Sequence, residues 1–261
     1  MSISAKEPIL RVNNVSKSFG GVRAVDSVSF EVNAGTVHGI IGPNGAGKTT
    51  LFNIICGALP LNNGSIFVDG VDVTGKPASA RAARGVLRTF QNLNLVGDYS
   101  VIENIMTGGL FRHGHGHGHG WRSFLMAGSA MRWEEDLWER AHDVAAELDL
   151  WAFRERRVTD LPAPIQRRVE IGRALMGDPK ILLLDEPVAG MSGAERMEVM
   201  ALIERLLSRT TVLLVEHDMN FVMRVCEHLS VLDQGRLIAD GSSSDVRSDQ
   251  SVIDAYLGES V

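Results

Sequence analysis

A glycine-rich run that ends in a lysine and two threonines carries the sharpest chemical signal in the sequence. It consists of Gly42, Pro43, Asn44, Gly45, Ala46, Gly47, Lys48, Thr49 and Thr50, and it fits the pattern GxxxxGK[ST]. Because the chain holds only five lysines, about 0.006 chance matches are expected. Glycines let backbone N–H groups converge on phosphate oxygens, and the following helix adds the positive end of its dipole. The run therefore predicts a nucleotide phosphate site in which Lys48 meets the β- and γ-phosphates, Thr49 binds Mg²⁺ and Thr50 donates to the α-phosphate.

Two apolar segments further along the chain end in charged side chains. ILLLDE ends in Asp185 and Glu186, so a buried strand would bring one carboxylate to a magnesium ion and the next to a water molecule. TVLLVEH ends in Glu216 and His217. From the residues alone, His217 is as readily a satisfied structural histidine as a donor to the γ-phosphate.

These groups need strands and helices to hold them. Residues 9–32 alternate in polarity around Gly20-Gly21, which predicts antiparallel strands. VHGIIG predicts a strand that leads into the glycine-rich run, and SIFVDG and VLRTFQ predict further strands. Apolar strands alternate with helical patterns, which predicts a parallel α/β core. Those helical patterns occupy 48–57, 165–176, 195–207 and 219–226.

The middle and the end of the chain have different patterns. Apolar residues at 133, 137, 141, 144 and 148 form one helical face, and we interpret that face as core packing inside a helical insertion. LSVLDQGRLIADG predicts a hairpin that turns at Gln234-Gly235, and SVIDAYLG predicts a short helix.

Composition excludes several classes of protein. The 261 residues are 44% apolar and 22% charged, as in globular domains. A net charge of −6 offers no basic footprint for nucleic acid. Two cysteines are too few for a disulfide framework and are expected to be buried thiols in a reducing compartment. The N-terminus lacks the apolar stretch of a signal peptide, and no apolar run approaches the roughly 18 residues that a spanning helix needs.

Taken together, the motifs resemble the ATP-binding cassette (ABC) family over nearly the whole chain. GPNGAGKTT resembles its Walker A motif, the FQ that ends in Gln91 its Q-loop, ILLLDE its Walker B motif, and EHD its switch histidine. The resemblance implies ATP and Mg²⁺ as cofactors, with Mg²⁺ held by Thr49, Gln91 and Asp185. It also implies that Glu186 polarises the attacking water, and that His217 and Lys48 hold the γ-phosphate. SKSFGGVRAV carries the adenine-stacking Phe19 and the nucleotide-contacting Val25.

The resemblance also implies an arrangement of subdomains. We expect a single ABC ATPase domain over 1–261, with a P-loop α/β core and an N-terminal antiparallel β subdomain. The expected ranges are 9–92 and 164–241 for the core with its β subdomain, 93–163 for a helical subdomain, 113–120 for a His-Gly loop, and 242–261 for a C-terminal helical tail.

Three longer stretches narrow the resemblance to a subfamily. QRRVEIGRALMGDPKILLLDEPVAGM, LLVEHDMNFVM and VIDAYLGES are similar to the larger ATPase of branched-chain amino acid uptake systems. This implies an ATPase that energises import of branched-chain amino acids or related small polar solutes. Its partners would be two integral-membrane permease subunits, a second ATPase subunit and, indirectly, a periplasmic or extracellular solute-binding protein. The chain would then be peripheral, on the cytoplasmic face of the plasma (inner) membrane.

Two alternatives stay open at this point. One is an export-type single-cassette ATPase, against which the tail VIDAYLGES and the long segment after the Q-loop speak. The other is an ATP-binding subunit with weak hydrolysis in a heterodimeric transporter. A non-transport cassette protein would generally carry two cassettes or a long coiled-coil insertion.

The second alternative rests on a departure from the family's LSGGQ signature loop. The aligned stretch runs from Leu161 to Gln166, with Pro162 in place of the serine and Pro164 in place of a glycine. Proline has neither a side-chain hydroxyl nor a backbone N–H. The serine hydroxyl and the glycine N–H that would donate to the partner's γ-phosphate are therefore both missing. Ser192 stands where the family commonly has an aspartate in its D-loop.

Four histidines from His113 to His119 alternate with glycines. This run is either a flexible surface insertion or a site that chelates Zn²⁺ or Ni²⁺.

Overall fold

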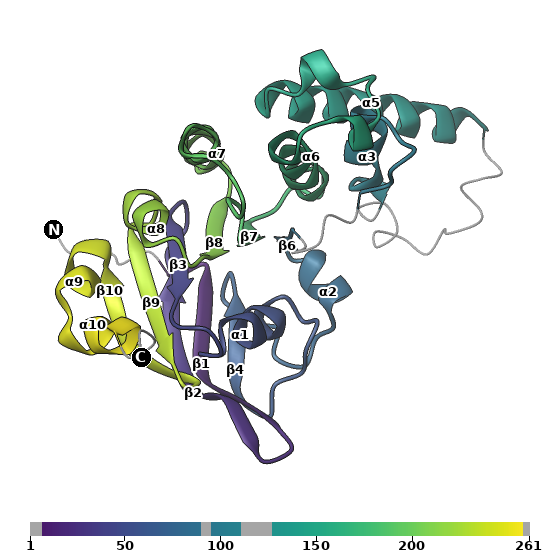
Figure 1. The fold of residues 1–261 in the computed structure, drawn as a ribbon. Coiled ribbons are helices and arrows are strands. Elements are labelled where there is room, and N and C mark those ends of the chain that lie inside the picture. The colour runs from purple at the N-terminus through teal and green to yellow at the C-terminus, as the bar shows by residue number, and fades with distance from the viewer. Residues whose placement is uncertain (1–6, 90–94, 111–126, 258–261) are drawn as a thin grey trace, which may run out of the picture. The chain divides into compact units, whose positions relative to one another are not determined.

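The computed structural model describes residues 7–89, 95–110 and 127–257 (Figure 1). The chain divides into two compact units. The first, which we call the core unit, comprises residues 1–86 and 180–261. The second, which we call the helical unit, comprises residues 87–179.

The N-terminal half of the core unit forms an antiparallel sheet. Within the described residues it has four strands in the order β2-β1-β4-β5. Their bounds are Leu10–Phe19 for β1, Val22–Val32 for β2, Asn63–Val68 for β4 and Val71–Asp72 for β5. Every other side chain at the start of β1 is buried, because successive residues of a strand point to opposite faces. The antiparallel pairing predicted for residues 9–32 is confirmed.

A second, mixed sheet forms the centre of the core unit. The described part of this sheet has the order β10-β9-β3-β8-β7-β6, with β3 between β9 and β8 (Figure 1). β3 pairs in parallel with β8 and β9, β7 pairs in parallel with β8, and β9 and β10 form an antiparallel hairpin. The strand bounds are Val37–Ile41 (β3), Val86–Arg88 (β6), Ile181–Asp185 (β7), Thr211–Val215 (β8), His228–Asp233 (β9) and Arg236–Ser242 (β10).

The predicted character of these strands is confirmed. Every residue of β3, β7 and β8 is buried, as expected for parallel strands covered on both faces. The β9–β10 turn lies at Gln234 and Gly235, which both have positive φ, the backbone that two-residue hairpin loops require. The strand predicted from Val86 onward ends at Arg88, and residues 90–94 lie outside the described ranges.

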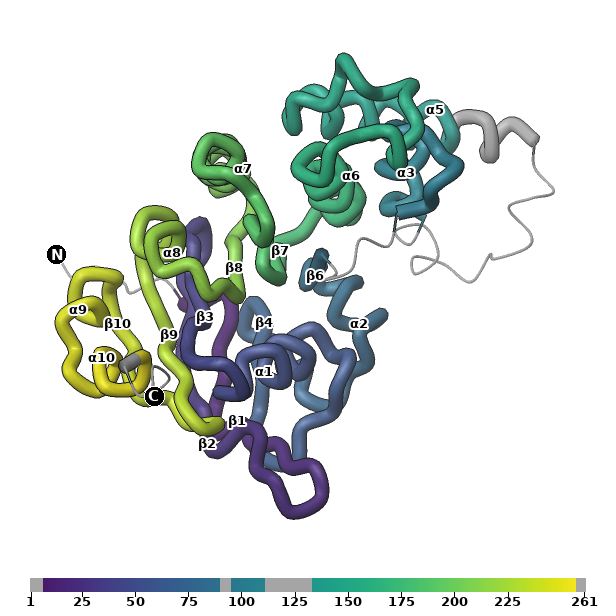
Figure 2. The backbone as a smooth tube through the Cα atoms, viewed as in Figure 1, coloured from purple at the N-terminus to yellow at the C-terminus, as the bar shows by residue number. Residues whose placement is uncertain are grey.

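Helices of the core unit connect and flank these strands. They are α1 (Lys48–Ile55), α2 (Ala78–Ala82), α7 (Gly193–Leu206), α8 (Met219–Val225), α9 (Ser243–Ser248) and α10 (Gln250–Leu257). α9 and α10 lie beside β10 at the end of the chain (Figure 2). Sequence patterns predicted α1, α7, α8 and α10 but not α2 and α9, which are too short to show a helical period.

The main apolar core joins both sheets to α1. Its members include Val12 of β1, Phe52 of α1, Leu183 of β7 and Leu213 of β8, all buried. Cys56 and Cys226 are both buried and neither is part of a disulfide, which confirms the expectation of buried thiols. The helix that follows the glycine-rich run is therefore packed in the core. This packing fixes the position of the C-terminal end of the run.

In the described part of the helical unit, three α-helices pack together. These are α3 (Val101–Thr107), α5 (Ala127–Glu147) and α6 (Ala163–Leu175), with short 3₁₀ turns η2 (Trp151–Phe153) and η3 (Val158–Asp160) between α5 and α6. Leu137, Ala141, Val144 and Leu148 are buried, which confirms the predicted core face. α6 contacts α3 and α5, so the helical unit extends to Pro179, beyond the expected limit at 163.

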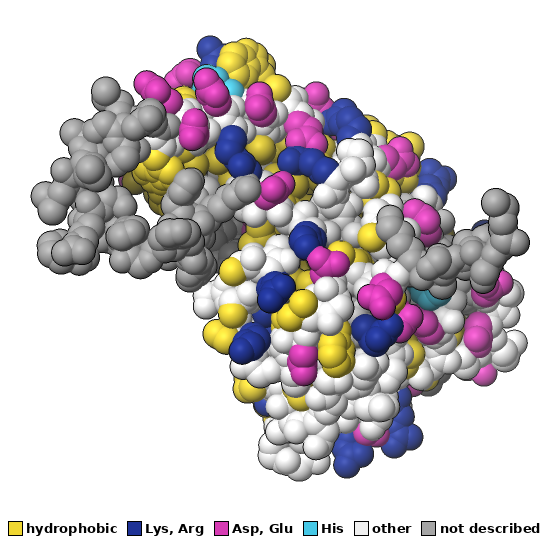
Figure 3. Space-filling view, turned by 180° about the vertical axis from the view of Figure 1, so that it is seen from behind, with side chains coloured by type: hydrophobic (Ala, Val, Ile, Leu, Met, Phe, Trp, Pro, Cys, Tyr) yellow, Lys and Arg dark blue, Asp and Glu magenta, His cyan; other side chains and the backbone are white. Residues whose placement is uncertain are grey.

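Side chains of both charges lie on the face of the molecule that Figure 3 shows, where basic and acidic residues are interspersed. Within the described ranges, none of the helices combines the length and the apolar composition needed to span a bilayer.

Candidate functional site

Strand register brings the predicted chemical groups to one edge of the mixed sheet. Ile40 of β3 pairs with Val215 of β8, and Val215 pairs in turn with Asp185 of β7. Neighbouring strands lie about 4.8 Å apart. The glycine-rich run, Glu216 and Glu186 thus leave adjacent strands at the same carboxyl edge, which is where open α/β sheets bind ligands.

The glycine-rich run depends on glycine at both of its ends. Gly42 has φ 146° and Gly47 has φ 100°, and L-residues rarely adopt such values. A Cβ atom at Gly42 would lie 2.0 Å from the carbonyl oxygen of Leu232, and one at Gly47 would lie 2.3 Å from that of Ala24. The backbone of β2 therefore touches the end of the run, and only glycine fits there.

The run leads directly into α1. Gly47 is the N-cap of this helix, and it makes no side-chain cap hydrogen bond, so the start of α1 faces the glycine-rich run through its backbone N–H groups. Such groups, with the positive end of the helix dipole, attract anions. The Lys48 ammonium donates to the carbonyl oxygens of Gly42 (2.6 Å) and Pro43 (2.7 Å). One cation and one helix start thus converge on the same loop.

Hydrogen bonds between backbone segments hold the run in place. The N–H of Gly235 donates to the carbonyl of Ala46 (3.0 Å), and the N–H of Asp26 donates to the carbonyl of Gly235 (2.7 Å). The β9–β10 turn thus joins the glycine-rich run to β2. The antiparallel sheet and the mixed sheet meet at this point.

The two acidic residues after β7 have different environments. Asp185 is 3% exposed, while the carboxylate of Glu186 is partly exposed. Glu186 has φ 47°, a left-handed value that costs a non-glycine residue free energy and clusters at functional sites. Its N–H donates to the carbonyl of Val215 at 2.9 Å, which continues the pairing of β7 with β8 and holds the turn.

Histidine and glutamate approach one another at this edge. Nδ1 of His217 lies 3.7 Å from Oε1 of Glu186 and 3.6 Å from Oε2 of Glu216. His217 is exposed, whereas Glu216 is 1% exposed. Sequence patterns singled out His217 and Glu186 but gave no role to Glu216, because a glutamate after an apolar strand carries no signal of burial.

The remaining predicted nucleotide contacts differ in exposure. Phe19, at the end of β1, is 49% exposed, and the Lys17 ammonium lies 5.3 Å from the centre of its ring. Val25 is fully buried in the apolar core, so its side chain offers no surface to a ligand. Asn44, Gly45 and Thr49 are exposed. Gln91 lies outside the described residues, as do His113 to His119.

The stretch aligned with the signature loop lies in the helical unit. Pro162 is the N-cap of α6 and Pro164 is in its first turn, without a side-chain cap. Nε2 of Gln166 donates to the carbonyl of Leu161 at 2.8 Å. Arg167 pairs with the buried Glu170 at 3.0 Å. Both prolines are compatible with the start of a helix, but neither supplies an N–H.

Ser192, at the aspartate position, has a structural role in the core unit. It is the N-cap of α7, and it forms a capping box with Glu195. Hydrogen bonds from the hydroxyl and the backbone N–H of Ser192 lower the pKa of the Glu195 carboxyl. Ser192 therefore caps the start of α7 at the position where the resemblance implies an aspartate.

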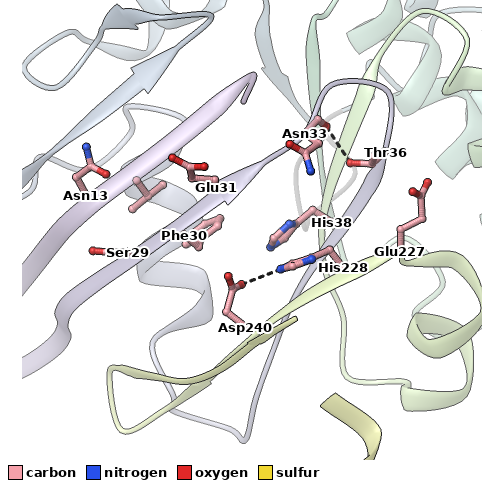
Figure 4. Close-up of a pocket in the computed structure, with 11 residues that line it drawn as sticks. Asn13, Ser29, Phe30, Glu31, Asn33, Thr36, His38, Glu227, His228 and Asp240 are labelled. Atoms are coloured by element: carbon pink, nitrogen blue, oxygen red, sulfur yellow. Dashed lines mark hydrogen bonds and ion pairs between the residues drawn. The ribbon is translucent and has the colours of Figure 1, made fainter. Parts of the chain in front are cut away.

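A separate polar pocket of about 590 Å³ lies beside the beginning of β3 (Figure 4). The ring of His38, 1% exposed, stacks on those of Phe30 and His228. Ser230 donates to Asp240 at 2.6 Å and accepts from Nε2 of His38 at 2.8 Å. Burial, followed by the nearby His228, lowers the pKa of His38 to about 3. Sequence patterns gave no indication of this cluster.

The fold and the site define a class of protein. A glycine-rich loop between a buried parallel strand and a helix, with acidic residues at the end of a neighbouring strand, is the arrangement of P-loop nucleotide-binding proteins. Residues 25–189 match the ABC transporter family. The chain therefore belongs to the ABC transporter family, and its fold is that of an ABC ATPase.

Comparison with curated proteins indicates a subfamily of ABC ATPases to which the chain is similar. Residues 236–261 match the branched-chain amino acid ATP-binding cassette transporter family. The chain is 39% identical to the high-affinity branched-chain amino acid transport ATP-binding protein BraF of Pseudomonas aeruginosa, over 97% of this chain and 98% of that protein. It is 36% identical to LivG of Escherichia coli K12, described in the same words, over 97% and 99%.

A solved structure has the same fold over nearly the whole chain. It is the crystal structure of an ATP-binding cassette of an ABC transporter in its ADP conformation. That protein is 33% identical, with a TM-score of 0.84, and the alignment covers 97% of this chain and all of the other. The family and fold expected from the motifs are thus confirmed.

Proposed function

We propose that this chain is the ATP-hydrolysing subunit of an importer that takes up branched-chain amino acids or related small polar solutes. The match of residues 236–261 to the branched-chain amino acid cassette family carries this proposal. Two relatives that align over nearly the whole chain bear the same substrate class in their names.

In the proposed reaction, the chain holds the phosphates and orders the attack of water. The loop N–H groups from Gly42 to Gly47 and the Lys48 ammonium bind the β- and γ-phosphates, Thr50 donates to the α-phosphate, and Phe19 stacks on adenine. Glu186 accepts a proton from the water as its oxygen attacks the γ-phosphorus. His217 donates to a γ-phosphate oxygen, and ADP leaves.

The donor set fits a magnesium ion. Thr49 is an exposed residue at the start of α1, and Asp185 ends β7, a strand of the same sheet, with a carboxylate. Mg²⁺ prefers such oxygen ligands and usually takes the rest of its shell from phosphates and water. We assign Thr49, Asp185 and Gln91 to this ion, which when bound neutralises charge on the phosphates.

The proposed assembly places the chain at a membrane. Two cassettes would sandwich two ATP molecules, each between the P-loop of one chain and the signature loop of the other. The second cassette is either a copy of this chain or a different ATPase subunit. Closure would drive two permease subunits from the cytoplasmic side, and a solute-binding protein would deliver the substrate on the opposite side.

A transport assay tests the proposal. The chain is purified with its membrane subunits, reconstituted in liposomes that enclose ATP, and supplied with its binding protein and radiolabelled leucine. We expect ATP-dependent accumulation of leucine, which the Glu186→Gln complex should lack. ATP hydrolysis without uptake of leucine, isoleucine or valine would show that the substrate class is wrong.

Pro162 and Pro164 favour a second form of this function, in which the signature loop supports hydrolysis weakly. A preorganised donor in a transition-state site is worth roughly 2.7–4 kcal/mol where it has been measured, and this loop lacks the hydroxyl and the N–H that Ser and Gly supply. A heterodimer would retain one competent signature loop facing this chain's Walker motifs. Restoring Pro162→Ser and Pro164→Gly should raise ATP turnover in the assembled transporter. Unchanged turnover would exclude the second form.

A further inference from the structure

Glu216 is a buried carboxylate at the carboxyl end of β8. Of the described residues, three donate backbone N–H groups to it. The N–H of Val188 donates to Oε1 at 3.2 Å, and the N–H groups of His217 and Asp218 donate to Oε2 at 2.9 and 3.3 Å. A charged group without water needs such donors, and a carboxylate forms stronger bonds to them than a neutral oxygen does.

These donors belong to two different loops. Val188 lies two residues after Glu186, in the turn that follows β7. His217 and Asp218 lie in the turn that follows β8. One side chain therefore ties the loop of the water-activating glutamate to the loop of the switch histidine.

The loop that carries Glu186 needs such support. Glu186 has a left-handed backbone, which persists only where the surrounding structure holds it. The N–H of Glu186 is bonded to the carbonyl of Val215, directly before Glu216. The Val188 bond adds a second attachment on the other side of Glu186, so its turn is fixed at both ends.

A second link joins the same two loops farther along the chain. Arg196, in the first turns of α7, forms an ion pair with Asp218 and donates to the carbonyl of Met191 at 3.1 Å. Asp218 in turn caps α8 by accepting the N–H of Phe221 at 3.1 Å. The buried bond network of Glu216 and the more exposed Arg196–Asp218 pair act on the same loops.

We propose that Glu216 is a positioning residue for ATP hydrolysis, which sets the separation of Glu186 and His217 through backbone N–H groups on both loops. This rests on the proposed ATPase function of the same site. Glu216 is 1% exposed, and its hydrogen bonds within the described residues go to Val188, His217 and Asp218, with none to the loop from Gly42 to Thr50. Its removal should therefore impair the chemical step more than nucleotide binding.

The isosteric variant Glu216→Gln isolates this role. Glutamine offers one oxygen in place of two, so its amide nitrogen must face at least one N–H donor and that attachment is lost. Displacing catalytic groups by about 1 Å can cost on the order of a hundredfold in rate. We expect kcat for ATP to fall by about tenfold to a hundredfold, while KM and the separately measured Kd for ATP change by less than about twofold.

The measurement is made on the purified complex with its partner subunits, in parallel with a matched control. Asp240→Asn also neutralises a carboxylate of the core unit, but Asp240 is exposed and lies in the pocket of Figure 4, and kcat should not change. Glu216→Asp keeps the charge on a shorter side chain that cannot span both loops. It should show the same kcat-selective loss, which keeps the test informative if Glu216→Gln folds poorly.

A double-mutant cycle with His217→Ala separates positioning from general support of the fold. If Glu216 acts through the two loops, Glu216→Gln should lower single-turnover hydrolysis much less in the His217→Ala background than in the wild type. Full additivity, unchanged kcat in both Glu216 variants, or a proportional loss of ATP affinity would overturn the proposal. Hydrolysis without leucine uptake by the wild type would instead contradict only the proposed substrate.

Discussion

Nδ1 of His217 lies 3.7 Å from Oε1 of Glu186, although the two residues follow different strands and are 31 positions apart in the chain. The separation is short because β7 and β8 pair in parallel, with Asp185 opposite Val215. The proposed acceptor of the water proton and the proposed donor to the γ-phosphate therefore lie close together at the same edge of the sheet. This relationship is the basis of the first prediction.

Replacing Glu186 by glutamine should remove the proton acceptor and keep the shape of the turn. General-base catalysis contributes about 10²–10⁴-fold in rate, so we expect steady-state ATP hydrolysis by the complex to fall by about that factor. ATP affinity, measured with a fluorescent analogue, should not weaken. Full turnover in the variant would refute the general-base role.

Gly47→Ala should disrupt the phosphate loop. An added Cβ would lie 2.3 Å from the carbonyl oxygen of Ala24, at a backbone φ of 100°, which costs an L-residue about 1–2 kcal/mol by itself. The loop must move, so its N–H groups no longer converge. We expect the Kd for ATP to rise by about tenfold or more, as measured by equilibrium binding.

Gly193→Ala is the matched control for that substitution. Gly193 begins α7, and an added Cβ there would meet no atom within 4 Å. Its binding of ATP should equal that of the wild type. If Gly47→Ala also binds ATP normally, the loop is more tolerant than its contacts with β2 indicate.

The local motifs could be predicted from the sequence, whereas the contacts between distant segments could not. GPNGAGKTT indicated its own strand–loop–helix setting, because glycine spacing and one lysine are sufficient to define it. Nothing in the sequence indicated that Ala24 would touch Gly47, since that contact depends on how the two sheets meet. The resemblance implied a nucleotide contact for Val25, and the sequence did not show that the packing of β2 buries its side chain completely.

The burial of charged residues also could not be predicted from the sequence. Arg81 is 2% exposed, but an arginine in a polar stretch gives no sign of this. Its guanidinium donates to the carbonyls of Ile54 (2.6 Å) and Ile55 (2.8 Å) at the end of α1, and to those of Thr74 and Lys76. It thus caps the helix whose first residue is Lys48, a role that depends on tertiary structure alone.

Arg81→Met should destabilise the core unit. The substitution keeps much of the apolar stem but leaves the carbonyls at the end of α1 without their donor, and a hydrogen bond to a charged group contributes about 1.5–3 kcal/mol. We expect the free energy of unfolding in urea to fall by about 2–4 kcal/mol. Arg84→Met, an exposed position in the next turn, should change it by less than about 0.5 kcal/mol. Equal stability of the two variants would contradict the capping role.

His38 should make the stability of the protein depend on pH between its folded and unfolded pKa values. Burial, with the charge of His228, lowers the pKa of His38 to about 3 from the usual 6.5, so below pH 6.5 the unfolded chain binds a proton that the folded chain does not. The contribution is complete above pH 6.5 and is lost as the pH falls toward 3, at up to about 1.4 kcal/mol per pH unit. His38→Gln still offers a donor to Ser230 but cannot titrate. Urea unfolding between about pH 7.5 and about pH 5, on either side of the unfolded pKa of 6.5, should therefore show a smaller loss of stability in acid for the variant, because its unfolded state gains no proton at position 38. Parallel pH profiles would mean that His38 is protonated in the folded protein as readily as in the unfolded chain.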